Sequence, residues 1–194
     1  MRKQEMQSNG QSFGMKDSFN LTFFVAHAHA MCFTPFMRSG IGYEAFGFTS
    51  LFSAILMLFL GGAVPAPDMF TFFLLWLFAV VIQRGRSWQA ERNGGNVHSH
   101  YQGWPVLAMR LVPFVKRQST AKIWVEPLMV LAAGRLICFI SPFVGDFVMW
   151  GSFSLAFTAR VQRQFWRARV RQLRNAQLEQ EQLTEMFNRT TDEF

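Results

Sequence analysis

The sequence lacks the motifs on which most catalytic sites depend. It has no glycine-rich loop for nucleotide phosphates, no serine or cysteine nucleophile beside a candidate base, no paired carboxylates within an apolar run and no cluster of metal-ligating residues. Its two cysteines, Cys32 and Cys138, lie far apart and form no paired spacing. These absences predict a protein that is not an enzyme and that needs no metal or cofactor.

Charge is also missing from long parts of the chain. Hydrophobic residues make up 51% of the 194 positions, with 23 Phe and 11 Met, yet the formal net charge is +7. Apolar and basic residues must therefore be segregated along the chain. The apolar residues gather in four blocks that are almost free of charge, at 45–64, 68–83, 123–140 and 143–159.

The lengths of these blocks point to a lipid environment. A helix of about 20 apolar residues crosses a hydrocarbon layer of about 30 Å, and a spanning segment must be helical because lipid offers backbone amides no other hydrogen-bond partner. The connections at 61–68 and 141–142 contain proline and are too short for a folded domain. We therefore predict an all-α integral membrane protein with four transmembrane helices, arranged as two helical hairpins at 41–83 and 123–159.

The basic residues predict the orientation of these helices. Apart from Arg135, every Lys and Arg lies in 1–40, in 84–122 or in 160–194, and neither tight turn carries one. Because basic residues accumulate on the cytoplasmic side of membrane proteins, both termini and the long central loop are predicted to be cytoplasmic. The predicted location is the cell inner membrane, with several passes.

Three segments lie outside the predicted spans. Within the N-terminal tail, residues 20–37 read as an interfacial helix on the cytoplasmic leaflet, because polar residues and Pro35 interrupt the apolar pattern. The loop 84–122 is predicted to lie against the membrane through its aromatic residues. Residues 160–194 contain no Gly or Pro and should continue the last span as a long cytoplasmic helix.

One face of this C-terminal helix is predicted to be strongly basic. The arginines that step by three or four residues are Arg160, Arg163, Arg167, Arg171 and Arg174. Such a stripe can meet anionic lipid headgroups or another protein. Nucleic acid is a less favoured partner, because the positive-inside bias already explains arginines next to a span.

Two charged residues fall within the third apolar block. Glu126 and Arg135 are nine positions apart, which places them on opposite faces of a helix and about 13 Å apart along it, so they cannot pair with each other. We interpret both as anchors for the two helix ends, with Glu126 at the N-terminus and Arg135 reaching toward headgroups or Asp146. The alternative is an ion or substrate path that uses both charges.

Small residues on the fourth block predict close helix packing. Gly151, Ser152 and Ala156 include a small-xxx-small spacing, which allows helix backbones to approach each other in lipid. Packing within the second hairpin is the favoured interpretation. A homo-oligomer interface is the alternative.

The histidines occur as two His-x-His pairs, His27 with His29 and His98 with His100. Metal, haem or pigment binding is one hypothesis for such pairs. On a helix, however, residues two positions apart point about 200° away from each other. We therefore favour hydrogen bonding at the membrane interface.

These observations leave three functional hypotheses. The first is a non-catalytic subunit or scaffold of a multi-subunit inner-membrane complex, which recruits a cytoplasmic partner through its C-terminal helix. The second is a small oligomeric channel or transporter that uses Arg135 and Glu126. The third is a pigment- or haem-binding membrane subunit that uses His27 or His29.

Overall fold

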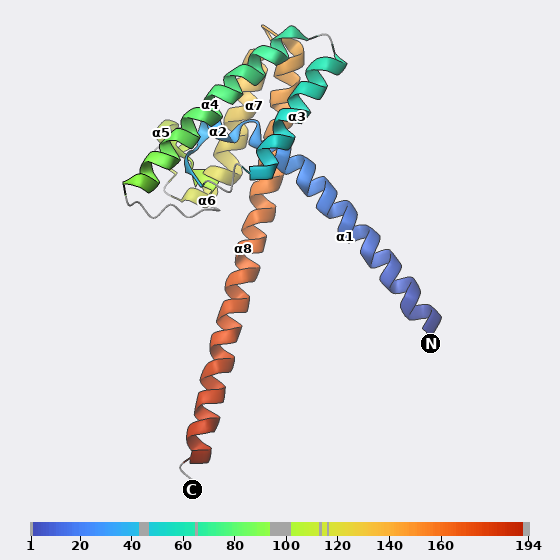
Figure 1. The fold of residues 1–194 in the computed structure, drawn as a ribbon, viewed down its shortest axis with the longest axis vertical. Coiled ribbons are helices and arrows are strands. Elements are labelled where there is room, and N and C mark those ends of the chain that lie inside the picture. Colours follow the sequence, from blue (N-terminus) through green and yellow to red (C-terminus); the bar gives the residue numbers. More distant parts are fainter. Residues whose placement is uncertain are drawn as a thin grey trace. The chain divides into compact units, whose positions relative to one another are not determined.

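The fold was analysed in a computed structural model, which describes residues 2–42, 47–64, 66–93, 102–112, 114–115 and 117–191. These residues are mostly helical, which confirms the predicted all-α class (Figure 1). The chain divides into two compact units, unit 1 (Met1–Thr158) and unit 2 (Ala159–Phe194). The described residues of unit 2 form the C-terminal part of the last helix.

The helices differ widely in length. They are α1 (Arg2–Met31), α2 (Thr34–Met37), α3 (Gly47–Ala63), α4 (Pro67–Arg92), α5 (Val106–Leu111), α6 (Gln118–Thr120), the π-helical η2 (Ala121–Val125), α7 (Glu126–Ile137) and α8 (Pro142–Thr191). Two short strands, β1 (Ser39–Ile41) and β2 (Gln102–Trp104), form one antiparallel pair. The helix α8 runs without interruption from the fourth apolar block into the basic tail, as the composition predicts.

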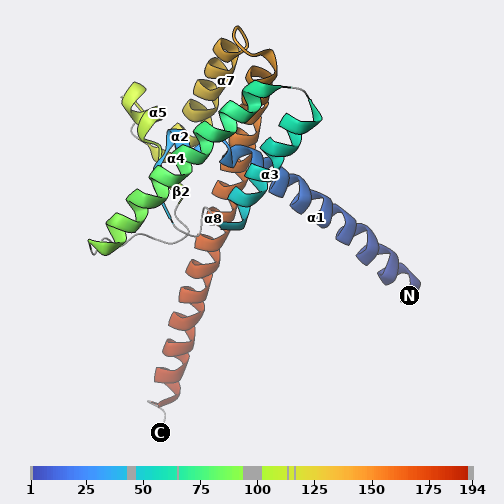
Figure 2. The ribbon, with the colours of Figure 1, turned by 45° about the horizontal axis from the view of Figure 1, so that its top comes forward.

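Two helical hairpins form the frame of unit 1, and their turns lie at the same end of it (Figures 1 and 2). We call this end the turn end. In the hairpin of α7 and α8, a Cβ added at Gly145 would overlap the Sγ of Cys138, and one added at Gly134 would lie 2.8 Å from the backbone N of Met149. Glycine is therefore required at both positions for the two helices to approach each other.

The predicted topology of four spans is not supported by the length and composition of the helices. Among the described residues, α4 alone is long and apolar enough to cross a membrane by length and composition, and α3 is a shorter apolar helix. With 17 residues in α3 and 12 in α7, both fall below the roughly 20 residues of a full crossing. In addition, α4 continues to Arg92, beyond the predicted end at Gln83, because no proline follows to stop the helix.

The structure also corrects the predicted interfacial helix at 20–37. Most residues between 28 and 42 are buried inside unit 1 rather than lying on its surface. The helix breaks between α1 and α2 because Pro35 has no N–H to donate to the carbonyl of Met31, four residues earlier. That carbonyl instead accepts a hydrogen bond from the indole Nε1 of Trp76 on α4, at 3.1 Å. The break is thus stabilised by a side chain from another helix.

The strand pair fixes the end of this buried segment. Ser39 pairs with Trp104 and Ile41 pairs with Gln102, so the central loop is tied to the segment 28–42. Gly103 has a φ of +80°, and a Cβ there would lie 2.7 Å from Cγ1 of Ile41. Only glycine fits both restrictions. The pairing was not predicted, because two strands of three residues leave no periodic pattern in the sequence.

Candidate functional site

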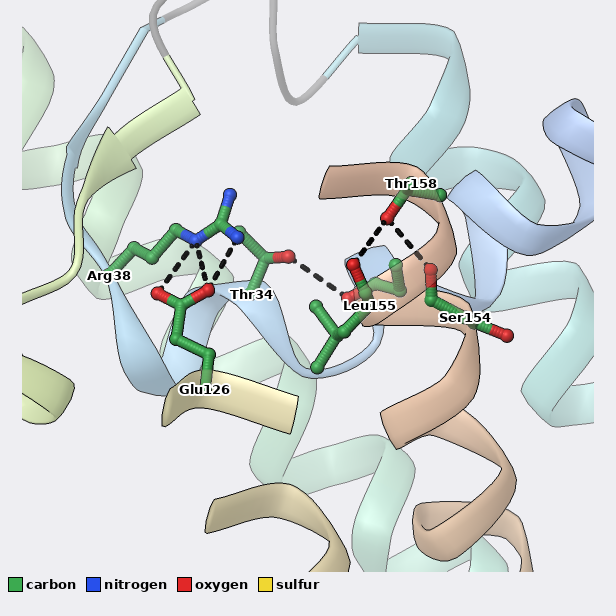
Figure 3. A network of polar contacts seen from close by, with 7 residues as sticks. Thr34, Arg38, Glu126, Ser154, Leu155 and Thr158 are labelled. Atoms are coloured by element: carbon green, nitrogen blue, oxygen red, sulfur yellow. Dashed lines mark hydrogen bonds and ion pairs between the residues drawn. The ribbon is translucent and has the colours of Figure 1, made fainter. Parts of the chain in front are cut away.

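A buried ion pair between Arg38 and Glu126 lies at the centre of the candidate site. The Nε of Arg38 donates to both carboxylate oxygens of Glu126 at 3.0 Å, and its Nη2 lies 2.5 Å from Oε2. Figure 3 shows the guanidinium and carboxylate groups facing each other. The exposed fraction is 6% for Arg38 and 0% for Glu126. Hydrogen bonds between two ionised groups are the strong kind, and removing either partner would leave a buried charge alone.

The surroundings of Glu126 differ from those expected for a helix-end anchor. The π-helical η2 leads directly into α7, and α6 leads into η2, so Glu126 lies within a continuous helical run from 118 to 137. The first free N–H groups of that run are about two turns away, so a helix terminus does not explain the carboxylate. Its partner Arg38 comes from the C-cap of α2 instead. The ion pair joins two distant parts of the sequence.

A third charged group lies beside the pair. Lys122 is half-buried and precedes Glu126 by four residues, about one helical turn. Burial and the nearby charge of Arg38 lower the pKa of Lys122 to about 8, and the carboxylate of Glu126 opposes this shift. Two cations against one carboxylate leave this cluster with a net positive charge below that pH.

Side chains from α3 and α4 satisfy the carbonyl groups of the buried segment 28–42. The hydroxyl of Ser53 donates to the carbonyl of Ala28 at 2.6 Å, and Ser87 donates to the carbonyl of Ile41 at 2.7 Å. Unbonded carbonyl groups at such depth would cost stability. The helices α3 and α4 therefore hold this irregular backbone through individual polar side chains.

Gln83 makes the most extensive of these contacts. Its Nε2 donates to the carbonyl of Pro35 at 3.2 Å and to that of Arg38 at 2.7 Å, and the residue is 6% exposed. Its Oε1 is the one buried side-chain oxygen that lacks a hydrogen-bond partner within the described part of the chain. Sequence reasoning missed Ser53, Gln83 and Ser87. The feature of the sequence that could have identified them is a polar residue within or just after an apolar block.

The two described histidines point in different directions, as their spacing predicts. Both ring nitrogens of His29 are engaged: Nδ1 lies 3.0 Å from the hydroxyl of Ser154, and Nε2 lies 3.2 Å from the carbonyl oxygen of Phe147. His27 stacks on Phe23 with 5.7 Å between ring centroids. No group of three or more His, Cys, Asp or Glu side chains that could hold a metal occurs in the described ranges. His98 and His100 lie outside those ranges.

Arg135 lies apart from this site. Its side chain is exposed, and its guanidinium carbon is 5.7 Å from the ring centroid of Phe139, close to the turn end. Glu126, by contrast, is fully buried against Arg38. The structure does not bring Glu126 and Arg135 together.

The predicted packing residues on α8 make different contacts from those expected. A Cβ at Gly151 would overlap the ring of Phe33. Gly151 therefore makes room for Phe33, which lies between α1 and α2, and not for a neighbouring hairpin helix. Ser152 donates to the carbonyl of Met149 on its own helix at 2.7 Å. Ala156 is half-buried. The nearby Thr158 also bonds within α8, to the carbonyls of Ser154 and Leu155 (Figure 3).

The basic stripe lies in unit 2 on the surface of α8. All five of its side chains are exposed: Arg160, Arg163, Arg167, Arg171 and Arg174. Several large apolar side chains of the same unit are exposed as well: Phe165, Trp166, Val170, Leu173, Leu183 and Phe187. Unit 2 therefore exposes both basic and apolar side chains.

The outer surface of unit 1 is rich in apolar side chains, although its core encloses an ion pair. Large apolar side chains are exposed along both hairpins: Phe48, Leu51, Ile55, Leu58 and Phe59 on α3, Phe70, Leu74, Leu75, Phe78 and Val81 on α4, Leu128 and Leu136 on α7, and Trp150 and Phe153 on α8. A surface of this extent is far more apolar than single scattered residues would make it. Unit 1 therefore has a largely apolar core that also encloses the ion pair and several polar side chains, and its outside is rich in apolar groups as well.

Comparison with known proteins gives no further guide: no protein-family model, no curated protein and no solved structure matches this chain.

Proposed function

We propose that the chain is a non-catalytic, membrane-embedded helical scaffold that recruits a cytoplasmic partner through the C-terminal part of α8. The observation that carries this proposal is the distribution of polarity in unit 1. Its interior holds an ion pair with 6% and 0% exposure, while Phe78 and Phe59 on its outside are 66% and 69% exposed. This arrangement suits a protein whose solvent is lipid.

The irregular segment 28–42 fits the same environment. Non-helical backbone is tolerated at membrane depth only where protein surrounds it and satisfies its polar groups. Ser53 and Trp76 donate to carbonyls at the C-terminal end of α1, and Gln83 and Ser87 do so further along the segment. The two hairpins would thus shield this segment from lipid.

The proposed topology keeps four crossings, with α4 as the longest. The 17 residues of α3 span about 25 Å at 1.5 Å per residue, which requires local thinning of the bilayer or support from its neighbours. In the second hairpin, residues 123–140 and the part of α8 that belongs to unit 1 would form the other two crossings. The shared turn end of both hairpins supports placing both turns on one side of the membrane (Figure 1).

The channel or transporter hypothesis receives less support. A path through Glu126 and Arg135 would need both charges to face a common space, yet Glu126 is fully buried in its pair with Arg38 and Arg135 is exposed beside Phe139. The pigment or haem hypothesis is weaker too, because both ring nitrogens of His29 already have partners.

Unit 2 supplies the proposed recruiting surface. Its first half is basic and its second half carries Glu179, Glu181 and Glu185, and all three are exposed. A helix with opposite charge at its two halves can select a partner helix of complementary pattern in one direction.

Native mass spectrometry of the full chain from a gentle detergent tests this proposal. We expect a hetero-complex with a stoichiometric partner, and we expect deletion of residues 176–194 to release that partner while the chain still inserts into the membrane. A pure homo-oligomer that is unaffected by the deletion would contradict the scaffold and favour the channel. A matched control replaces Arg135 with Gln, which should leave the complex intact because that residue lies in unit 1.

A further inference from the structure

Basic and aromatic residues gather at the end of unit 1 opposite the turn end. They are Arg84, Arg86, Trp88 and Arg92 on α4, Trp104 on β2, Arg110 on α5, and Arg117 and Trp124 beside and within η2, and we call them the aromatic-basic belt. The three tryptophans are 57%, 46% and 56% exposed in chain order. None of the arginines in this set takes part in the buried pair of Arg38 and Glu126.

Contacts between the elements connect the parts of unit 1 that carry the belt. Ser87, next to Trp88, donates to the carbonyl of Ile41 at 2.7 Å. Ser39, in the same strand as Ile41, pairs with Trp104. The helix α5 follows β2 directly and packs against η2, which contains Trp124. The elements that carry the belt are therefore connected parts of unit 1.

The chemistry of the belt matches one kind of partner. Arg92 places its guanidinium carbon 3.7 Å from the ring centroid of Trp88, so cation and ring form one amphipathic surface. Exposed tryptophans mark the level of lipid headgroups, and adjacent Lys and Arg attract anionic headgroups. At the turn end, by contrast, the two hairpin turns carry Asp68 and Asp146. With Glu91 counted at the belt and Arg135 at the turn end, basic residues still outnumber acidic ones at the belt, and acidic residues outnumber basic ones at the turn end.

We propose that the aromatic-basic belt seats unit 1 in the headgroup layer of an anionic lipid leaflet and retains anionic phospholipids there. This inference deepens the proposed function and rests on its membrane embedding. It assigns lipid retention to the belt in unit 1 and not to the basic stripe in unit 2. It also sets the depth of the protein, because the belt lies beyond Gln83, where the apolar part of α4 ends.

The test compares two triple variants of the full chain that remove equal charge. One is Arg86→Gln/Arg110→Gln/Arg117→Gln in the belt, and the other is Arg163→Gln/Arg167→Gln/Arg171→Gln in the tail; all six side chains are exposed. Each chain is incorporated into vesicles made of equal amounts of phosphatidylglycerol and phosphatidylcholine and is then purified from them. Native mass spectrometry then counts the lipids of each class that remain bound.

We expect the unmodified chain and the tail variant to retain phosphatidylglycerol in preference to phosphatidylcholine. The belt variant should lose this preference, with binding weaker by on the order of 100-fold, since each cation near an anionic surface contributes about fivefold. Added inorganic phosphate should not displace the lipid. Displacement by phosphate, an equal effect of the two variants, or no lipid preference in the unmodified chain would each overturn the inference.

Two controls keep the outcomes separate. If the belt triple variant unfolds in detergent, the single variant Arg110→Gln should still weaken phosphatidylglycerol retention by about fivefold. If the unmodified chain stays in solution without detergent, the proposed membrane embedding fails, and this inference fails with it. If the chain is embedded but shows no anionic preference, the inference alone fails.

Discussion

The segment 28–42 and the outer face of α4 lie in the same unit but have opposite surroundings. In the segment, Arg38 is 6% exposed and its charge is met by Glu126. On the outer face of α4, Leu75 and Phe78 are 57% and 66% exposed. A protein dissolved in water would place these groups the other way round, since apolar burial is the main force for folding in water. In unit 1 this charge is enclosed by protein, whereas large apolar side chains on α4 are not.

The largest expected effect comes from removing the buried charge of Arg38. Replacing Arg38 with Met should lower the free energy of unfolding by about 3–5 kcal/mol, because Glu126 would remain as a buried charge without its partner. Denaturant titration in detergent micelles measures this change. The double variant Arg38→Met/Glu126→Leu should recover most of the loss, because no buried charge remains. A double variant as unstable as the single one would show that the pair is not the cause.

The second largest expected effect comes from placing a charge on the outer face of α4. Leu75→Arg should reduce membrane insertion by about 3 kcal/mol, the cost of a cation near the centre of a spanning helix. Resistance of the chain to alkaline extraction from membranes measures insertion. Gln89→Arg provides the control, since Gln89 is exposed on the same helix but lies beyond Gln83 in the belt region. Equal losses from the two substitutions would mean that α4 does not cross the bilayer at Leu75.

A smaller effect sharpens the role of the polar side chains around the segment 28–42. Gln83→Leu removes the donor to the carbonyls of Pro35 and Arg38, and the free energy of unfolding should fall by about 1–3 kcal/mol. The same substitution at the exposed Gln89 should have almost no effect. Denaturant titration compares the stability of the two variants. Equal stability would show that the hydrogen bonds of Gln83 do not stabilise the segment.

The smallest expected effect concerns Lys122, whose pKa is lowered to about 8 by burial and by Arg38. Between this value and the usual lysine pKa of about 10.4, the unfolded chain keeps a proton that the folded chain has lost. The free energy of unfolding should therefore rise as the pH increases through this window. Lys122→Met should flatten this rise in denaturant titrations at several pH values. An unchanged pH profile in this variant would mean that a group other than Lys122 causes the rise.

Local composition was enough to predict part of this fold. Helix-favouring residues without Gly or Pro predicted that α8 would run on into the basic tail, and proline placed both turns. The partner of Glu126 could not be predicted, because Arg38 lies 88 positions away and nothing local links the two. The sequence predicts an interfacial helix at 20–37, because polar residues and Pro35 interrupt the apolar pattern there. Carbonyls of the segment 28–42 are instead satisfied by side chains from other helices, which a single segment does not reveal.

The sequence indicates single residues of the site but not the groups that they contact. Glu126 and Arg135 stand out because charge is rare in apolar blocks, yet their different fates depend on what other segments bring to them. Gly151 was read as part of a helix interface from its spacing, but the group it admits is the ring of Phe33. Spacing along one helix indicates which residues share a face. It does not indicate what meets that face.

The central claim is that the outer face of α4 lies in lipid. Its most direct test places single cysteines at Leu74, Phe78 and Val81, in a Cys138→Ser background, and attaches an environment-sensitive fluorophore to each in reconstituted vesicles. These side chains are 48%, 66% and 62% exposed in unit 1. The account predicts that lipid-borne quenchers reduce the fluorescence at all three positions and that aqueous iodide does not. Quenching by iodide at all three, with none from lipid, would contradict it.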